Sequence, residues 1–131
     1  MIKRKKLTKN LLLKEVDTND VNYILKLRTD KLLSKFLNPT SNNKKKQLLW
    51  LKEYFERRKK KEEFYFIFQI KKKKIYKNLG FARIIKIDQK TFHFGGWILQ
   101  NNTSPWIALE CCISIYIYAF ELLNYKRCLL W

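Results

Sequence analysis

A short polar loop between two apolar segments is the part of the sequence best suited to bind a charged ligand. It spans residues 101–105, after an aromatic and β-branched segment at 91–100 and before a long apolar segment at 106–123. Pro105 stands in the first turn of the expected helix, where proline is tolerated best. A strand, a polar loop and a helix N-terminus present unpaired backbone N–H groups at the positive end of a helix dipole. We therefore predict an anion site here, and we interpret it as one that holds a pyrophosphate.

The chain carries a large excess of positive charge. Its 131 residues include 29 Lys and Arg against 11 Asp and Glu, a formal net charge of +18. This balance indicates a nucleic-acid or anionic-membrane partner, or else an AT-rich coding bias, because Lys, Asn, Ile, Phe and Tyr are all frequent. The lysines form runs between apolar segments, as solvated loops and helix ends do, without a recognised motif. We favour the coding bias as the explanation of the net charge. We keep a small basic nucleic-acid-binding protein as the alternative function.

Composition predicts a single ordered domain over residues 1–131. Apolar residues make up 47% of the chain and aromatic residues 15%, which is enough for a core. The cysteines at 111, 112 and 128 lack the spacing of metal ligands, and their number is odd. The first ten residues are basic and do not form a secretory signal. We therefore expect a reducing, cytoplasmic environment and no metal site.

The apolar segment 106–123 is the one stretch to consider for a membrane span. Glu110 and Glu121 lie within it, and each carboxylate would cost about 3 kcal/mol in the centre of a bilayer. A central helix packed on both sides explains the same composition. We therefore expect no membrane span.

Local patterns predict the order β-α-α-β-β-β-α-β. Strands are expected at 6–16, 64–70, 79–87, 91–99 and 126–131, and helices at 20–28, 44–61 and 106–123. Gly95 and Gly96 predict a bulge in the fourth strand. The middle strands form an antiparallel meander, and the last helix crosses over to a final strand parallel to the one before it. This is an α+β domain with helices on both faces of a mixed, mostly antiparallel sheet.

Several short motifs give the chain a family resemblance. They are Leu27-Arg28-Thr29-Asp30, Gln47 with Trp50-Leu51, Phe64-Tyr65-Phe66, Leu79-Gly80, Ile87-Asp88, Gly95-Gly96-Trp97-Ile98 and Ala119-Phe120-Glu121-Leu122-Leu123. Their order and spacing over nearly the whole chain resemble the GNAT superfamily of acyl-CoA N-acyltransferases. The similarity is greatest to the branch with ribosomal-protein N-terminal acetyltransferases and amino-sugar acetyltransferases. It implies a GNAT-like sheet and acetyl-CoA as the acyl donor.

In that family the pantetheine arm lies where the fourth strand parts from the fifth, and the pyrophosphate lies on the loop that follows. By resemblance, the corresponding residues here are Trp97, Ile98, Leu99, Gln100, Asn102, Thr103, Ser104, Trp106 and Ile107. The family's loop, Q/R-x-x-G-x-G/A, has glycines that this chain lacks, and Pro105 removes one donor. The remaining donors are then expected at Trp106, Ile107 and Ala108. The alternative is a loop whose Thr103 or Ser104 simply caps the helix.

The resemblance also implies direct attack of an amine on the thioester, assisted by a general base. His93 is the only histidine, and it lies on the strand where some relatives place a carboxylate base. An imidazole titrates near neutral pH and suits this role, although a lone strand histidine can equally be structural. Glu110 and Glu121 are the alternative bases. Arg28 and Trp50 are candidates to face the acceptor. The alternative for Arg28 is a surface charge, and the alternative for Trp50 is an aromatic residue of the core.

Relatives continue beyond the fifth strand with a further helix and a β-hairpin, whereas this sequence ends at Trp131. We expect a truncated product, with two alternatives: a short form whose sheet edge a second copy or a partner completes, and an inactive remnant. The expected activity is transfer of an acetyl group from acetyl-CoA to a primary amine. The acceptor is a small molecule or peptide, either a nucleotide-linked amino sugar or a protein N-terminus.

Overall fold

The secondary structure follows the predicted order from the first α-helix onward. The computed structural model describes residues 3–33, 35 and 43–130. In chain order, its elements are β1 (Arg4–Lys5), β2 (Leu12–Glu15), a 3₁₀ turn (Thr18–Asp20), α1 (Val21–Arg28), α2 (Lys44–Lys59), β3 (Glu63–Lys72), β4 (Ile75–Lys86), β5 (Thr91–Leu99), α3 (Pro105–Ile117), a π-helical turn (Tyr118–Leu122) and β6 (Arg127–Leu129).

The strands form one six-stranded mixed sheet in the order β1-β2-β3-β4-β5-β6. Neighbours from β1 to β5 are antiparallel, whereas β6 lies parallel to β5. The crossover from β5 to β6 runs through α3 and the π-helical turn, as a parallel connection requires. The predicted α+β architecture and the parallel final strand are therefore confirmed.

The prediction of one continuous strand at 6–16 was wrong. The chain instead forms β1 and β2, joined by a loop that binds to α3. Glu110 accepts hydrogen bonds from the Thr8 hydroxyl (2.7 Å), the Asn10 backbone N–H (2.7 Å) and the Asn10 side-chain amide (2.9 Å). These tertiary contacts give the polar residues of the loop partners that a strand at the edge of a sheet would not provide.

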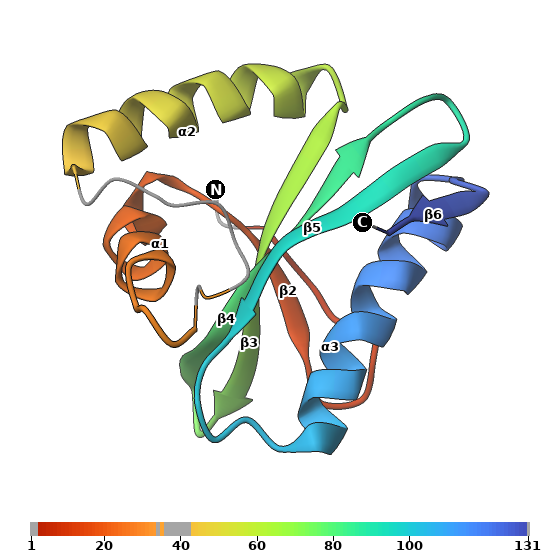
Figure 1. The fold of residues 1–131 in the computed structure, drawn as a ribbon. Coiled ribbons are helices and arrows are strands. Elements are labelled where there is room, and N and C mark those ends of the chain that lie inside the picture. Colours follow the sequence, from red (N-terminus) through yellow and green to blue (C-terminus); the bar gives the residue numbers. More distant parts are fainter. Residues whose placement is uncertain (1–2, 34, 36–42, 131) are drawn as a thin grey trace.

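Helices cover both faces of the sheet, α1 and α2 on one and α3 on the other (Figure 1). Successive side chains of a strand point to opposite faces, and in β3 both sets are buried. Tyr65 and Ile67 pack with the side chains of α1 and α2, while Phe64, Phe66 and Phe68 pack with those of α3. This double burial explains why β3 reads as an uninterrupted apolar run.

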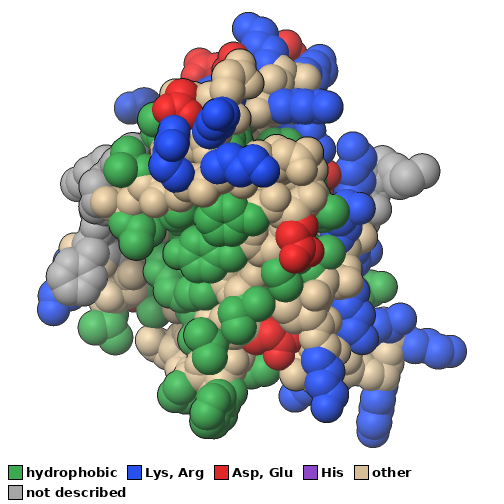
Figure 2. All heavy atoms as spheres, turned by 90° about the vertical axis from the view of Figure 1, so that its right-hand side faces the viewer, with side chains coloured by type: hydrophobic (Ala, Val, Ile, Leu, Met, Phe, Trp, Pro, Cys, Tyr) green, Lys and Arg blue, Asp and Glu red, His purple; other side chains and the backbone are tan. Residues whose placement is uncertain are grey.

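Residues Pro105–Leu122 form one helical segment that is long and apolar enough to be considered for a membrane span by length and composition alone. One side of it packs on the sheet through Cys111 and Ile115, which are fully buried. Its Glu110 binds the loop between β1 and β2. Hydrophobic side chains gather on the outer face (Figure 2), where Trp106, Leu109 and Ile113 are exposed. We interpret the segment as a helix that covers the sheet, so it is not a clear membrane span.

Candidate active site

Strand β5 carries the predicted bulge at its glycines. Gly95 and Ile98 pair with positions 83 and 81 of β4, so Gly96 and Trp97 together oppose the single residue Ala82. Gly96 has a φ of 57°, in the left-handed region where residues with a Cβ are disfavoured. A bulge of this kind bends its strand and changes the direction of the following side chains.

Strands β5 and β6 are paired at one end only. The ladder joins Thr91 to Arg127, Phe92 to Cys128 and His93 to Leu129. Residues 94–99 of β5 have no β6 partner within the described part of the chain. We call the side of residues 94–99 that faces away from β4 the wedge.

The N-terminus of α3 follows the open end of the wedge. The Ser104 hydroxyl accepts a hydrogen bond from the Ile107 N–H (3.3 Å), and the Ser104 carbonyl accepts one from the Ala108 N–H (2.9 Å). Among the donors expected here, Trp106 alone has a backbone N–H without an acceptor in the described residues. The expectation of three available donors was therefore wrong, because Ser104 caps the helix.

Hydrogen bonds at Gln100 hold the loop before α3. The Gln100 N–H donates to the Leu79 carbonyl (2.9 Å), which extends the β4–β5 ladder by one bond, and the Thr103 hydroxyl donates to the Gln100 carbonyl (2.7 Å). Asn102 takes the left-handed conformation, with a φ of 67°, which asparagine tolerates better than most residues. The loop thus turns tightly without the glycines of the family pattern.

The residues predicted to bind the cofactor form one continuous path from the wedge to the first turn of α3. Ile98 is buried, Trp97 is 37% exposed, and Trp106 is 79% exposed. The path comprises Trp97, Ile98, Leu99, Gln100, Asn102, Thr103, Ser104, Trp106 and Ile107. The structure places them together, and their role in binding stays a prediction.

His93 lies at the closed end of the wedge and is 8% exposed. Its Nδ1 is 2.9 Å from the Leu129 carbonyl oxygen of β6. Because a carbonyl oxygen only accepts, we assign the proton to Nδ1, and Nε2 is then the basic nitrogen of the neutral ring. The ring packs beside Gly95, where a Cβ would lie 2.8 Å from Nε2. Of the alternative bases, Glu110 binds the N-terminal loop and Glu121 is exposed.

A charged cluster lies against the bulge on the α2 side of the sheet. Glu63 is 3% exposed and accepts hydrogen bonds from Arg83 Nε (3.1 Å) and Nη2 and from Arg57 Nε (3.0 Å). The guanidinium groups of Arg83 and Arg57 lie 5.1 and 5.2 Å from the centre of the Trp50 ring. A Cβ on Gly96 would lie 3.0 Å from Arg83 Cδ. The cluster therefore places a fixed positive charge directly beside the bulge.

Glu63 and Arg83 were not predicted as site residues. The available signal was the presence of charged residues in strands that are otherwise apolar, since buried charges are usually paired. Trp50, by contrast, was named as a residue that could face the acceptor. It lies next to the cluster, stacked on Tyr54 and edge-on to Tyr65.

The Tyr65 hydroxyl is buried near this cluster. Burial raises the pKa of Tyr65 to about 12, and the positive charges of Arg28 and Arg83 act in the opposite direction. The phenol therefore remains protonated at neutral pH. The influence of Arg28 also places that side chain, which was a candidate to face the acceptor, within reach of the same region.

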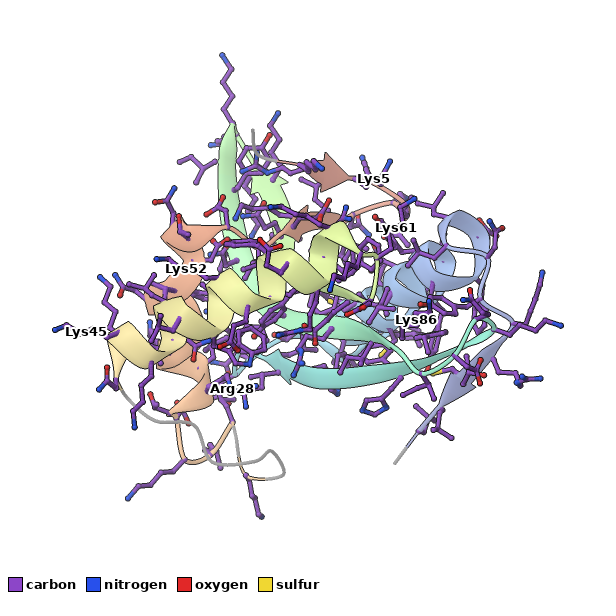
Figure 3. The ribbon with its side chains drawn as sticks, turned by 90° about the horizontal axis from the view of Figure 1, so that it is seen from above. Lys5, Arg28, Lys45, Lys52, Lys61 and Lys86 are labelled. Carbon is purple, nitrogen blue, oxygen red and sulfur yellow. The ribbon has the colours of Figure 1, made fainter. Side chains whose placement is uncertain are left out.

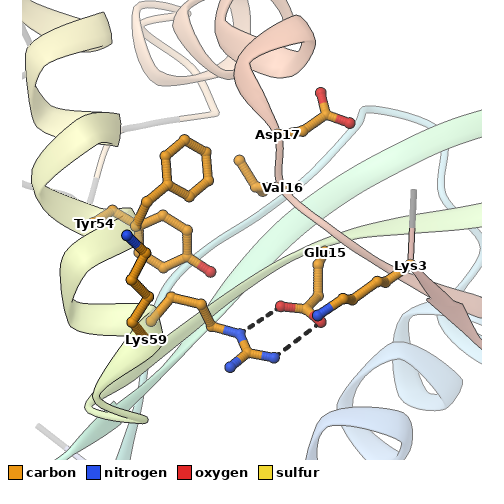
Figure 4. A pocket seen from close by; sticks show the side chains of 8 residues that line it. Lys3, Glu15, Val16, Asp17, Tyr54 and Lys59 are labelled. Carbon is orange, nitrogen blue, oxygen red and sulfur yellow. Dashed lines mark hydrogen bonds and ion pairs between the residues drawn. The ribbon is translucent and has the colours of Figure 1, made fainter. Parts of the chain in front are cut away.

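A separate cavity of about 300 Å³ lies between β2 and the C-terminal half of α2 (Figure 4). Glu15 accepts two hydrogen bonds there from Arg58, at 2.5 and 3.1 Å. This hydrogen bonding raises the pKa of Arg58, while burial acts against it. Nearby, the Tyr54 hydroxyl accepts a hydrogen bond from the Tyr65 N–H (2.9 Å). These contacts fix α2 to the sheet, and the cavity shares no lining residue with the wedge.

Comparison with known proteins identifies the fold. No protein-family model and no curated protein matches the sequence. Solved structures do match. An apo nucleotide-linked sugar GNAT, FdhC, is 24% identical with a TM-score of 0.78, over 92% of this chain and 68% of that one. The ribosomal L7/L12 α-N-protein acetyltransferase RimL is 12% identical with a TM-score of 0.76, over 99% and 71%. The chain has the GNAT fold.

A further GNAT structure carries bound ligands. It is the spermidine N-acetyltransferase of Vibrio cholerae in complex with CoA and spermine, 18% identical with a TM-score of 0.74, over 94% of this chain and 71% of that one. The GNAT neighbours thus act on sugar, protein and polyamine amines. Identities this low establish the fold of this chain and leave its substrate open.

Proposed function

We propose that this protein is an N-acetyltransferase that moves an acetyl group from acetyl-CoA to a primary amine. The observation that carries the proposal is the wedge, the edge of β5 that follows the last pair with β6 at His93, contains the bulge and leads to the N-terminus of α3. A CoA complex is known for one structural neighbour with the same fold.

Two parts of the chain are suited to hold acetyl-CoA. Residues 94–99 of β5 offer backbone groups, on the side away from β4, that can pair with the amides of the pantetheine arm. The Trp106 N–H and the positive end of α3 suit a pyrophosphate. Pro105 provides no N–H and the loop has no glycine, so we expect the pyrophosphate to be held by fewer backbone donors than in the family pattern.

Acetyl-CoA supplies an activated thioester carbonyl. We propose that His93 Nε2 removes the proton that the acceptor ammonium must lose before it attacks, either directly or through water. The new C–N bond forms as the C–S bond breaks, and CoA leaves as the thiol. His93 suits this role because its Nδ1 is bound to Leu129, which fixes the ring at the end of the wedge.

The charged cluster bears on the choice of acceptor. Glu63 offsets one of the two guanidinium charges of Arg57 and Arg83, which leaves a net positive charge beside the bulge. A polyamine would be repelled by this charge. We therefore favour a nucleotide-linked amino sugar as the acceptor, or alternatively a protein N-terminus next to acidic residues.

The three cysteines are free thiols, which supports a cytoplasmic location.

The direct test is ligand-induced stabilisation of the full chain followed by a transfer assay. Acetyl-CoA at 100 times its Kd should stabilise the protein by about 2.7 kcal/mol, whereas adenosine should have no effect at the same concentration. Acetyl transfer is then measured by mass spectrometry with a nucleotide-linked amino sugar, an acidic peptide and spermidine. Absence of any stabilisation by acetyl-CoA would refute the proposal.

A further inference from the structure

A band of cations runs from β1 to the tip of the β3–β4 hairpin. We call it the hairpin ridge, and it consists of Arg4, Lys5 and Lys6 from the N-terminal segment and Lys71, Lys72, Lys73, Lys74 and Lys77 from the hairpin. Arg4 joins the two parts. Its Nε donates to the Gln69 side chain (2.9 Å), and its guanidinium lies 3.7 Å from the centre of the Tyr76 ring.

The charges of the hairpin ridge are not neutralised by carboxylates. None of its cations forms an ion pair with the part of the chain that the structure describes, and the sequence from Lys71 to Asn78 contains no acidic residue. The cations at the end of α2 differ, because Arg57, Arg58 and Lys59 each pair with a glutamate. The hairpin ridge therefore attracts anions more strongly than its charge count alone suggests.

Both faces of the hairpin carry these charges. Lys71 pairs with Tyr76 and Lys72 with Ile75 in the β3–β4 ladder, and successive pairs point to opposite faces. Tyr76 is 39% exposed, and an open groove of about 930 Å³ runs beside the hairpin as far as Gln100. A flat membrane would contact one face of such a projection. A flexible polyanion can follow both faces and the groove.

We propose that the hairpin ridge binds single-stranded nucleic acid through its phosphates. The reason is charge complementarity. Cations of β1, β3, β4 and the β3–β4 turn form no ion pair within the described residues, and they lie near the exposed aromatic ring of Tyr76. Backbone phosphates supply the affinity, and counterion release makes that affinity salt-dependent. The surface is separate from the charged cluster beside the bulge.

The test compares two variants of equal charge. Lys71→Gln, Lys72→Gln and Lys77→Gln together alter the hairpin ridge, and Lys44→Gln, Lys45→Gln and Lys46→Gln together form the control at the N-terminal end of α2. Lys45 there and Lys5 on β1 lie well apart (Figure 3). Binding of a fluorescein-labelled 20-nucleotide RNA is measured by anisotropy at several salt concentrations. Vesicles containing phosphatidylserine are the second probe, and circular dichroism melting checks the fold of each variant.

The hairpin variant should bind RNA at least about 10-fold more weakly than wild type. The slope of log K against log salt should be about 2 smaller in magnitude, because each of the three lost phosphate contacts contributes about 0.7 to it. The control should change affinity less than about 3-fold. Equal losses in both variants would overturn the proposal, because they indicate diffuse attraction. Salt-dependent binding to vesicles without binding to RNA would also overturn it in favour of a membrane surface.

Discussion

The carboxylate of Glu63 holds the guanidinium of Arg83 beneath the bulge of β5, and it holds Arg57 at the same time. Removing the charge by Glu63→Gln leaves two arginines without a counterion in a partly buried place. We expect a loss of about 2 kcal/mol in the free energy of unfolding, measured by urea denaturation. The adjacent exposed Glu62→Gln should cost less than about 0.5 kcal/mol. Equal effects would show that the cluster does not stabilise the fold.

Two glycines should differ sharply in their tolerance of a Cβ. At Gly80 the added atom would lie 2.1 Å from the Ile98 carbonyl oxygen, so backbone must move, and Gly80→Ala should cost about 3 kcal/mol or more. At Gly96 the nearest atom is the flexible Arg83 side chain, and Gly96→Ala should cost about 1 kcal/mol for its left-handed φ. Thermal melting measures both. The reverse order would contradict the register of β4 and β5.

Ser104 offers a test that separates a phosphate site from a simple helix cap. Asp caps a helix as well as Ser does, but it adds a negative charge where the pyrophosphate is proposed. Ser104→Asp should keep the wild-type melting temperature and weaken acetyl-CoA binding at least about 10-fold. Ser104→Ala should lose about 0.5–1 kcal/mol of stability and, because it adds no negative charge, weaken acetyl-CoA binding less than Ser104→Asp does. If Ser104→Asp binds acetyl-CoA like the wild type, the loop is only a cap.

The roles of the two ring nitrogens of His93 can be tested separately by substitution. Asn at this position keeps a donor for the Leu129 carbonyl and has no basic nitrogen, whereas Ala removes both. We expect kcat to fall about 100-fold in His93→Asn and His93→Ala alike. The Ala variant alone should lose about 1 kcal/mol of stability. Wild-type kcat in the Asn variant would assign His93 a purely structural role.

The stability of the protein in acid should depend on Glu110. Burial tends to raise the pKa of Glu110, but hydrogen bonds from Thr8 and Asn10 together lower it below the ordinary value. A carboxylate whose pKa is lower in the folded state contributes stability above its unfolded pKa and loses it as pH falls through the folded pKa. Wild type should thus lose stability relative to Glu110→Gln below about pH 4.5. Parallel curves of unfolding free energy from pH 7 to pH 3 would argue against this role.

Local signals account for much of the fold. Gly95 and Gly96 predicted the bulge, Ser104 and Pro105 predicted the start of α3, and the crossover rule predicted a parallel last strand. The loop that replaced the first predicted strand depends on Glu110, about 100 residues away in sequence, and no local pattern indicates that contact. The pairing of Glu63 with Arg83 likewise depends on the register of β3 against β4. Sequence therefore located the bulge and the start of α3, and tertiary contacts decided which charged groups stand beside the bulge.

The short pairing between β5 and β6 decides how a long ligand can reach the protein. Three residue pairs attach β6 to the sheet, and its outer edge has no further strand within the described residues. Residues 94–99 of β5 therefore have no partner strand on that side within the described residues. A ligand that extends along them has no need to thread in lengthwise from the α3 end, because it can settle against this edge from the side without displacing β6.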